Sequence, residues 1–288
     1  MASFAYFSDL GLNLHHALYA TAFASPESAG SAQPLPAELA VADRPEFVRA
    51  VEFYQQRFPG RDLPFDQELV ELKTFLVFGH GTPPAGWQDV FDPVRPLYAE
   101  TDWPAQDELN RAWSAQVADR LDRLPEILDE LQRRYRCTLP AAEVLRVDTV
   151  WVGHRVPAYT TLEPTHLTCS TTNPDSQGWT AVEILLHEAS HALANPLRLA
   201  IRDRVDTSDR GLGQLWHVVL FHLTGETVRR ALAGIGVDYR TYADSTGLFD
   251  RAWPQWRGPI TQAWAGYLDG TEDWVEACDR LVAGIPER

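Results

Sequence analysis

The sequence is poor in cysteine and lysine, and both shortages restrict what the protein can be. It has three cysteines, Cys137, Cys169 and Cys278, which is an odd number, and it contains no C-x-x-C pair. The pattern excludes a disulfide framework and a cysteine zinc ribbon, and it is typical of reduced thiols in a cytosolic protein. Lys73 is the single lysine among 25 basic residues, an arginine bias that we attribute to a GC-rich genome rather than to function.

Long apolar runs and an early basic segment are also missing. No stretch approaches the roughly 18 consecutive apolar residues that a membrane-spanning helix requires. A signal peptide needs a basic start and an unbroken apolar core, but no Lys or Arg precedes Arg44, and Asn13 and two histidines interrupt the candidate core. Although Ala22-Phe23-Ala24 resembles a cleavage site, we expect no signal peptide and a cytoplasmic protein.

Acidic residues outnumber basic ones by 40 to 25, so the formal net charge is -15. Nucleic acid and anionic membranes repel such a surface, and we expect neither as a partner. A hydrophobic fraction of 45% is typical of a globular protein, and 288 residues suffice for one large domain or two modest ones. We therefore expect a globular protein that acts on a peptide or a small molecule.

The hydrophobic pattern is mostly helical, with one short region of strands. We expect helices over the ranges 9–24, 37–57, 65–78, 104–136, 212–233, 247–266 and 271–284. Pro125 is expected to kink or divide the fourth of these. The runs Leu145 to Val152 and Tyr159 to Thr171 predict strands, and loops are expected at 25–36 and 196–211. The predicted fold class is therefore α+β, mostly α-helical.

One short motif carries most of the chemistry: His187-Glu188-Ala189-Ser190-His191, an H-E-x-x-H sequence in an apolar helical stretch. Two histidines four residues apart project from one face of a helix and can bind one zinc ion, while the glutamate reaches the water on that ion. Asp175 or Ser176 is expected to cap this helix, and Asn195-Pro196 is expected to end it. Because a buried helix does not carry such polar groups without partners, we interpret the motif as a Zn²⁺ site.

A catalytic zinc ion usually takes three protein ligands and a water, so the motif lacks one ligand. The metzincin pattern H-x-x-G-x-x-H is absent, but the expected helix 212–233 offers three candidates, His217, His222 and Glu226. His217 and Glu226 are nine residues apart, which places them on opposite faces of a straight helix. Gly225 indicates a close approach to the motif helix and favours Glu226, with His217 and His222 as alternatives.

With these residues the chain resembles the zincin metallopeptidases of the gluzincin, thermolysin-like type. The resemblance implies that His187 and His191 are zinc ligands, that Glu188 is the general base and that Glu226 is the third ligand. Residues 192–225 make a longer spacer than in thermolysin. The resemblance also implies a zincin-like core in which a small sheet precedes the motif helix.

A second resemblance is to uncharacterised bacterial zincin-like proteins. It rests on segments such as Ala158-Tyr159-Thr160-Thr161, Trp216-His217 and Thr224-Gly225-Glu226, and it implies no particular activity. We expect residues 1–140 to form a helical part that packs on a zincin-like catalytic part at 141–288, in one compact unit.

The expected reaction is hydrolysis of a peptide bond. Zinc lowers the pKa of a bound water from about 15.7 towards about 7, and Glu188 accepts its proton before the attack on a carbonyl carbon. The resulting oxyanion needs a hydrogen-bond donor. We favour Tyr242 for this role, with Tyr239, Tyr267 and His217 as alternatives.

Two other functions stay open at this point. One is a zincin-fold hydrolase that acts on a non-peptide or a dedicated biosynthetic intermediate, and the other is a metal-binding protein without turnover. Glu188 argues against the latter, because a structural site needs no base. The run 159–170 is expected to offer a strand edge to an extended peptide. Glu183 is expected to orient a motif histidine or to form a salt bridge, and His15 and His16 are interpreted as packed core residues.

Overall fold

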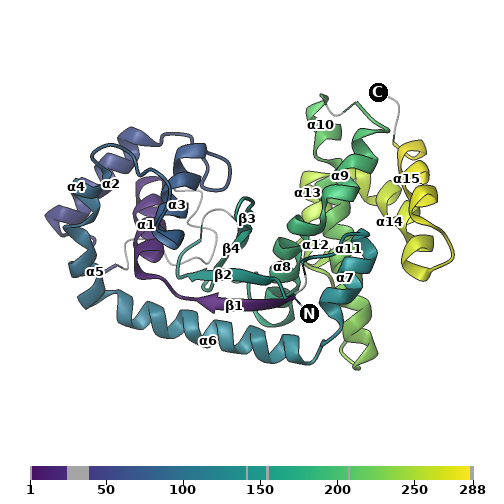
Figure 1. The fold of residues 1–288 in the computed structure, drawn as a ribbon, viewed down its shortest axis with the longest axis horizontal. Helices are drawn as coiled ribbons and strands as arrows, with labels where there is room; N and C mark the ends of the chain where they lie inside the picture. Colours follow the sequence, from purple (N-terminus) through teal and green to yellow (C-terminus); the bar gives the residue numbers. More distant parts are fainter. Residues whose placement is uncertain (1, 25–38, 141, 154–155, 207, 286–288) are drawn as a thin grey trace. The chain divides into compact units, whose positions relative to one another are not determined.

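The computed structural model of the chain describes residues 2–24, 39–140, 142–153, 156–206 and 208–285, and Figure 1 labels its helices and strands. The loop expected at 25–36 lies outside these residues. The chain divides into two compact units that interleave along the sequence. The sheet unit contains residues 4–118 and 145–177, and the motif unit contains residues 1–3, 119–144 and 178–288. The sequence-based division at residue 140 differs from this interleaved arrangement.

Four strands form one mixed sheet. They are β1 (Ser3–Phe7), β2 (Val144–Val150), β3 (Ala158–Thr161) and β4 (His166–Ser170), and they lie in the order β1-β2-β4-β3. β4 is parallel to β2, with Leu167 opposite Val147, and antiparallel to β3, with Thr168 opposite Tyr159. The strand predicted at 145–152 is confirmed, whereas β1 was not predicted. The fold class is α+β with a small sheet, as the sequence indicates.

The run 159–171 forms two strands of a hairpin rather than one strand. Glu163 in the turn has a φ of 70°, and Pro164 follows it without a backbone N–H to donate to a ladder. β4 is fully buried and has β2 and β3 as neighbours, so it has no edge to offer. The expectation of a substrate-pairing edge along 159–170 is therefore wrong for β4, and of the two hairpin strands β3 is the one at an edge of the sheet.

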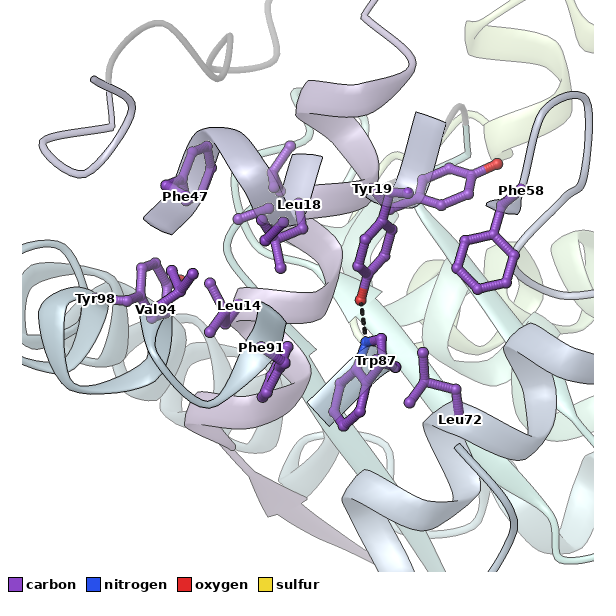
Figure 2. Packing of buried hydrophobic residues seen from close by; sticks show 14 of the residues in the cluster. Leu14, Leu18, Tyr19, Phe47, Phe58, Leu72, Trp87, Phe91, Val94 and Tyr98 are labelled. Carbon is purple, nitrogen blue, oxygen red and sulfur yellow. Dashed lines mark hydrogen bonds between the residues drawn. The ribbon is translucent and has the colours of Figure 1, made fainter. Parts of the chain in front are cut away.

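Helices make up most of the sheet unit. They are α1 (Leu10–Ala22), α2 (Pro45–Arg57), α3 (Gln67–Phe78), α4 (Trp87–Phe91), α5 (Val94–Thr101) and the start of α6 (Trp103–Asp122). Figure 2 shows how Leu14 and Leu18 of α1 pack with Phe91 of α4 in the apolar core. Full burial of a side chain of this size contributes about 1.5–3 kcal/mol. The indole N–H of Trp87 donates to the Tyr54 hydroxyl at 3.0 Å, so this polar tip is satisfied inside the core.

His15 and His16 are part of this core. His15 Nδ1 lies 2.7 Å from the Tyr54 hydroxyl, and His16 Nε2 lies 3.1 Å from the Tyr159 hydroxyl. The two rings are nearly perpendicular, at 86°. Burial lowers the pKa of His15 to about 3, so its ring is neutral at physiological pH. These contacts agree with their interpretation as packed core residues.

The described part of the motif unit is helical. After the end of α6 it contains α7 (Ile127–Tyr135), α8 (Gly178–Ser190), the 3-10 turn His191–Leu193, α9 (Asn195–Arg202), α10 (Arg210–Gly213), α11 (Leu215–Gly234), α12 (Tyr242–Ser245), α13 (Leu248–Ala252), α14 (Pro254–Asp269) and α15 (Trp274–Ala283). The division of the long helix predicted at 104–136 is confirmed, because α6 ends at Asp122 and α7 begins at Ile127. None of the helices in the described ranges has both the length and the apolar character that crossing a bilayer demands.

The loop predicted at 196–211 is wrong, since α9 occupies its first half. α8 ends at Ser190 and the 3-10 turn after it ends at Leu193, so the motif helix stops before the expected Asn195-Pro196. Pro196 stands instead in the first turn of α9, where its missing N–H costs nothing. Leu197 and Ile201, four residues apart, are the buried side chains of this helix. The Asn-Pro pair therefore begins a helix instead of ending one.

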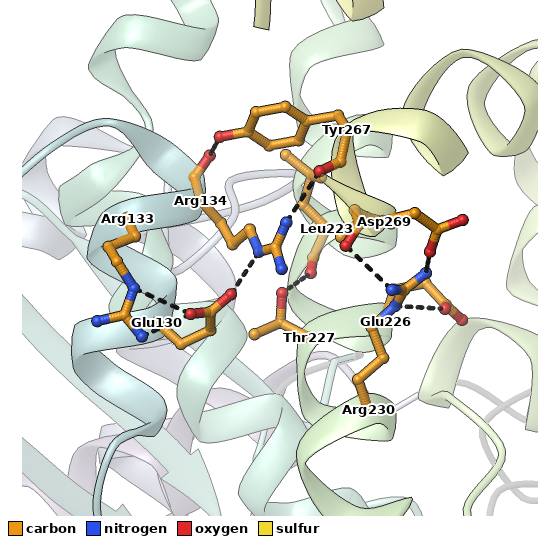
Figure 3. Close-up of polar contacts among 10 residues, drawn as sticks. Glu130, Arg133, Arg134, Leu223, Glu226, Thr227, Arg230, Tyr267 and Asp269 are labelled. Atoms are coloured by element: carbon orange, nitrogen blue, oxygen red, sulfur yellow. Dashed lines mark hydrogen bonds and ion pairs between the residues drawn. The ribbon is translucent and has the colours of Figure 1, made fainter. Parts of the chain in front are cut away.

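Helix α11 is the centre of the motif unit and packs against α7, α8 and α14. The Tyr135 hydroxyl of α7 donates to Leu220 O at 3.0 Å and lies 2.8 Å from Thr224 Oγ1, which in turn donates to Ser190 Oγ of α8. Figure 3 shows a second set of contacts, in which Arg230 of α11 donates to Leu268 O and pairs with Asp269 of α14. These polar contacts hold α11 in one position relative to α8.

Candidate metal centre

The two motif histidines lie where an apolar helix ends. Ten consecutive residues of α8, from Ala181 to Ser190, are buried, which leaves His187 on the covered part of the helix. His191 begins the 3-10 turn and its side chain is 17% exposed. The two ring centroids are 5.2 Å apart, as expected for side chains four residues apart on one helical face.

His217 of α11 completes a group of three histidines. Its ring centroid is 5.3 Å from that of His187 and 5.2 Å from that of His191, so the rings form a nearly equilateral triangle. One nitrogen from each ring lies within 4.8 Å of the others, and among the described residues this is the group that could hold a metal ion. Sequence reasoning ranked His217 only as an alternative.

One distance in this group equals the spacing of two ligands on a tetrahedral zinc ion. Two nitrogens that bind one tetrahedral zinc ion, each about 2.0–2.1 Å from it, lie about 3.3 Å apart. The Nε2 atoms of His187 and His217 are 3.3 Å apart. His187 Nδ1 is buried and has no hydrogen-bond partner among the residues that the structure describes. The ring stacks on Phe221, with centroids 3.8 Å apart.

All three rings are in the protonation state that metal binding needs. Burial lowers the pKa of His187 well below its usual range, and the neighbouring His191 and His217 lower it further. Burial likewise lowers the pKa of His191 to about 3 and that of His217 to about 4. Each ring is therefore neutral at physiological pH and has a lone pair to donate.

Glu188 places a carboxylate beside the three rings without belonging to the group. It is 6% exposed, and its Oε2 lies 3.9 Å from His191 Nε2. Among the described residues, the group of ligand atoms within 4.8 Å of one another contains the three histidines and not Glu188, so this carboxylate lies near His191 but outside the group. The expected role of Glu188 as a general base remains a prediction.

Aromatic rings surround the three histidines. Trp216 packs edge-on against His191, Phe221 stacks on His187, and Trp253 packs edge-on against His217, with centroids 5.7, 3.8 and 6.2 Å apart. Sequence reasoning did not assign these rings to the site. The spacing of His217 and Phe221, four residues apart on α11, is the one local signal that could have placed both on the face towards α8.

The structure does not bring Glu226 to the histidines. Both of its carboxylate oxygens accept hydrogen bonds from Arg229, at 2.9 and 2.8 Å, and Arg230 lies 3.8 Å away. His222, the other alternative, lines a pocket together with Glu226 and Asp244. Among the described residues the structure therefore groups His217, and not the expected Glu226, with the two motif histidines.

The tyrosines considered as oxyanion donors lie at different places. The Tyr239 hydroxyl donates to Glu183 Oε2 at 2.6 Å, and the Tyr267 hydroxyl donates to Arg134 O at 2.9 Å. The Tyr242 ring stacks on Phe221, with centroids 6.2 Å apart, and is the one of the three that contacts a ring of the site.

Glu183 lies one turn before the motif, and within the described ranges it forms neither a salt bridge nor a hydrogen bond to a motif histidine. Its Oε2 accepts hydrogen bonds from the Tyr239 hydroxyl at 2.6 Å and from the backbone N–H of Tyr242 at 2.8 Å. Burial raises the pKa of this carboxyl group to about 7. Glu183 thus ties α8 to the start of α12.

Because of this raised pKa, Glu183 should make stability depend on pH. The folded state keeps the proton up to about pH 7 while the unfolded chain loses it near pH 4.5, so stability falls as the pH rises through this interval. The metal-free protein should lose about 3 kcal/mol of unfolding free energy between pH 4.5 and pH 8 from this group. Urea unfolding across this range measures the loss, which Glu183→Gln should remove. An equal pH dependence in the variant would contradict the assignment.

Gly225 of α11 contacts α8 closely, as expected, but for a different reason than metal binding. A Cβ at this position would lie 2.9 Å from Glu183 Oε1 and 3.2 Å from Thr241 Cβ. Since two hydrogen bonds hold the Glu183 carboxyl, we expect Gly225→Ala to destabilise the protein by about 1–3 kcal/mol in chemical denaturation. Gly234→Ala, at the end of the same helix and with no atom within 4 Å of its Cβ, is the control and should not destabilise.

Comparison with known proteins adds no information about the function of this site. No protein-family model, no curated protein and no solved structure matches this chain.

Proposed function

We propose that the protein is a zinc-dependent hydrolase that cleaves a peptide bond. The observation that carries this proposal is the group of three neutral histidines, His187, His191 and His217, with the Glu188 carboxylate beside it. Three histidine ligands with an open fourth position are typical of catalytic rather than structural zinc sites. A structural site is usually closed by four protein ligands and has no use for an adjacent base.

In this proposal the bound zinc ion would supply a Lewis acid that acidifies water and polarises the substrate carbonyl. Glu188 accepts the proton of the attacking water and returns it to the leaving amine. The partial exposure of His191 leaves one side of the group open to a substrate. Tyr242, which stacks on Phe221, is the proposed donor to the oxyanion.

The proposal is tested by metal content and hydrolysis measured on the same preparation. We expect about one zinc per chain by mass spectrometry after purification without added metal. A peptide mixture should yield cleavage products that disappear with a chelator and return when zinc is restored. A chain that takes up no metal even when zinc is offered would remove the basis of the proposal. A zinc-loaded chain that cleaves no peptide would point to a non-peptide substrate.

A further inference from the structure

Arg198 of α9 stacks on an aromatic ring and has no acidic partner among the described residues. Its guanidinium carbon lies 3.8 Å from the centroid of the Trp216 ring, and its Nε is buried without a hydrogen-bond partner. Among the described residues it forms no ion pair, although the chain contains 40 acidic residues. By contrast, Arg202 and Arg204, four and six residues later, pair with Asp203 and Asp279.

This unpaired cation lies beside the metal centre. Arg198 stacks on the Trp216 ring. The centroid of this ring lies 5.7 Å from that of His191 and 5.2 Å from that of His217. Arg198, Trp216 and the two histidines therefore form one continuous surface of the motif unit.

An unpaired and partly buried guanidinium is costly. Burial lowers the pKa of Arg198 itself, since the charged form loses hydration without gaining a partner. The fork of a guanidinium matches a carboxylate with two parallel hydrogen bonds, and stacking on Trp216 fixes its plane. Glu188 is the one carboxylate described next to the histidines, and a divalent ion would leave this surface with excess positive charge. An anionic ligand group would pair with the Arg198 guanidinium and would reduce the excess positive charge.

We propose that Arg198 binds a free carboxylate of the substrate, so that the protein cleaves the last peptide bond before a free C-terminus. This inference rests on the proposed function. The rings of Trp216, Phe221 and Trp253 would hold an apolar or aromatic side chain on the same substrate. In the reaction one water is consumed, its oxygen forms a bond to the carbonyl carbon, the C–N bond breaks, and the released amine takes a proton. The products are a shortened acid and a free amino acid.

Two measurements on the full-length protein test this assignment. The first compares hydrolysis of N-benzoylglycyl-phenylalanine with hydrolysis of its carboxamide. We expect the zinc-loaded wild type to prefer the free acid by about 100-fold in kcat/KM, and Arg198→Met to lose that preference with unchanged zinc content. The second is calorimetric titration with 3-phenylpropanoate and with 3-phenylpropanamide, in zinc-loaded and metal-free protein, which needs no turnover.

Arg202→Met is the matched control, because Arg202 lies one turn later on α9 with its side chain 63% exposed. It should keep both the preference and the binding. Arg198→Lys keeps the charge but not the fork, and should bind phenylpropanoate with intermediate affinity, which keeps the test informative if Arg198→Met does not fold.

The outcomes separate this inference from the proposed function. Phenylpropanoate binding that depends on Arg198, in a protein that cleaves neither peptide, would support the carboxylate site and overturn the peptidase. Cleavage of acid and amide at equal rates, or phenylpropanoate binding that survives Arg198→Met, would overturn the carboxylate site and leave the peptidase intact.

Discussion

The Glu188→Gln variant is expected to bind zinc like the wild type and to lose nearly all hydrolytic activity. Glutamine has the same shape as glutamate, so the packing of this 6% exposed side chain should change little. It cannot accept a proton, however, and removal of a general base typically lowers the rate by about 10²–10⁴-fold. Because Glu188 lies outside the group of histidines, the effect should fall on kcat and leave zinc stoichiometry unchanged.

Steady-state kinetics and mass spectrometry on one preparation check this expectation. Glu52→Gln is a suitable control, since Glu52 is an exposed residue of α2 in the sheet unit. A Glu188→Gln variant that keeps full activity would show that another group accepts the proton. Loss of zinc together with activity would show instead that Glu188 is a ligand.

The second large effect is expected from the third ligand. The His217→Ala variant should lose zinc, whereas Glu226→Ala should retain it. Structural zinc sites with four ligands have apparent binding free energies of about 10–16 kcal/mol, or about 3 kcal/mol for each ligand. Removal of one ligand should therefore weaken zinc binding by about 100-fold or more. Glu226 is ion-paired with Arg229, so its removal should leave the histidines undisturbed.

Competition with a chromogenic chelator measures the zinc affinity of each variant. His222→Ala provides a second control on the same helix, because His222 lines the pocket that contains Glu226. If Glu226→Ala lost zinc and His217→Ala retained it, the ligand set would be the one that the resemblance to gluzincins implies.

The choice between His217 and Glu226 shows where sequence reasoning ends. The H-E-x-x-H helix could be predicted because its two histidines depend only on helical periodicity, which is local. The third ligand depends on which face of α11 meets α8. The buried residues of α11 are distributed around its whole circumference, so its sequence does not show which face that is. Gly225 correctly indicated a close contact with α8, but the space is filled by Glu183 and Thr241. A close contact therefore did not identify the metal-binding face.

The same distinction applies to the fold. The strand at 145–152 and the division near Pro125 followed from local patterns and are confirmed. The hairpin of β3 and β4 was not recognised, because residues typical of strands continue through both and only a four-residue turn at 162–165 separates them. α9 was missed because Asn-Pro is a signal both for the end of a helix and, with proline in the first turn, for the start of the next.

The interleaving of the two units has a consequence for synthesis on the ribosome. Every residue of the sheet unit precedes residue 178, whereas the motif unit waits for residues up to 288. Domains fold as they emerge, so the sheet unit, which is fully synthesised before His187, can begin to fold before the motif unit is complete. Residues 119–144 belong to the motif unit and include α7, which packs against α11. This packing cannot form until α11, in the last third of the chain, has been synthesised. The candidate metal centre is therefore assembled late, and a chain stalled before His217 would carry two of its three histidines.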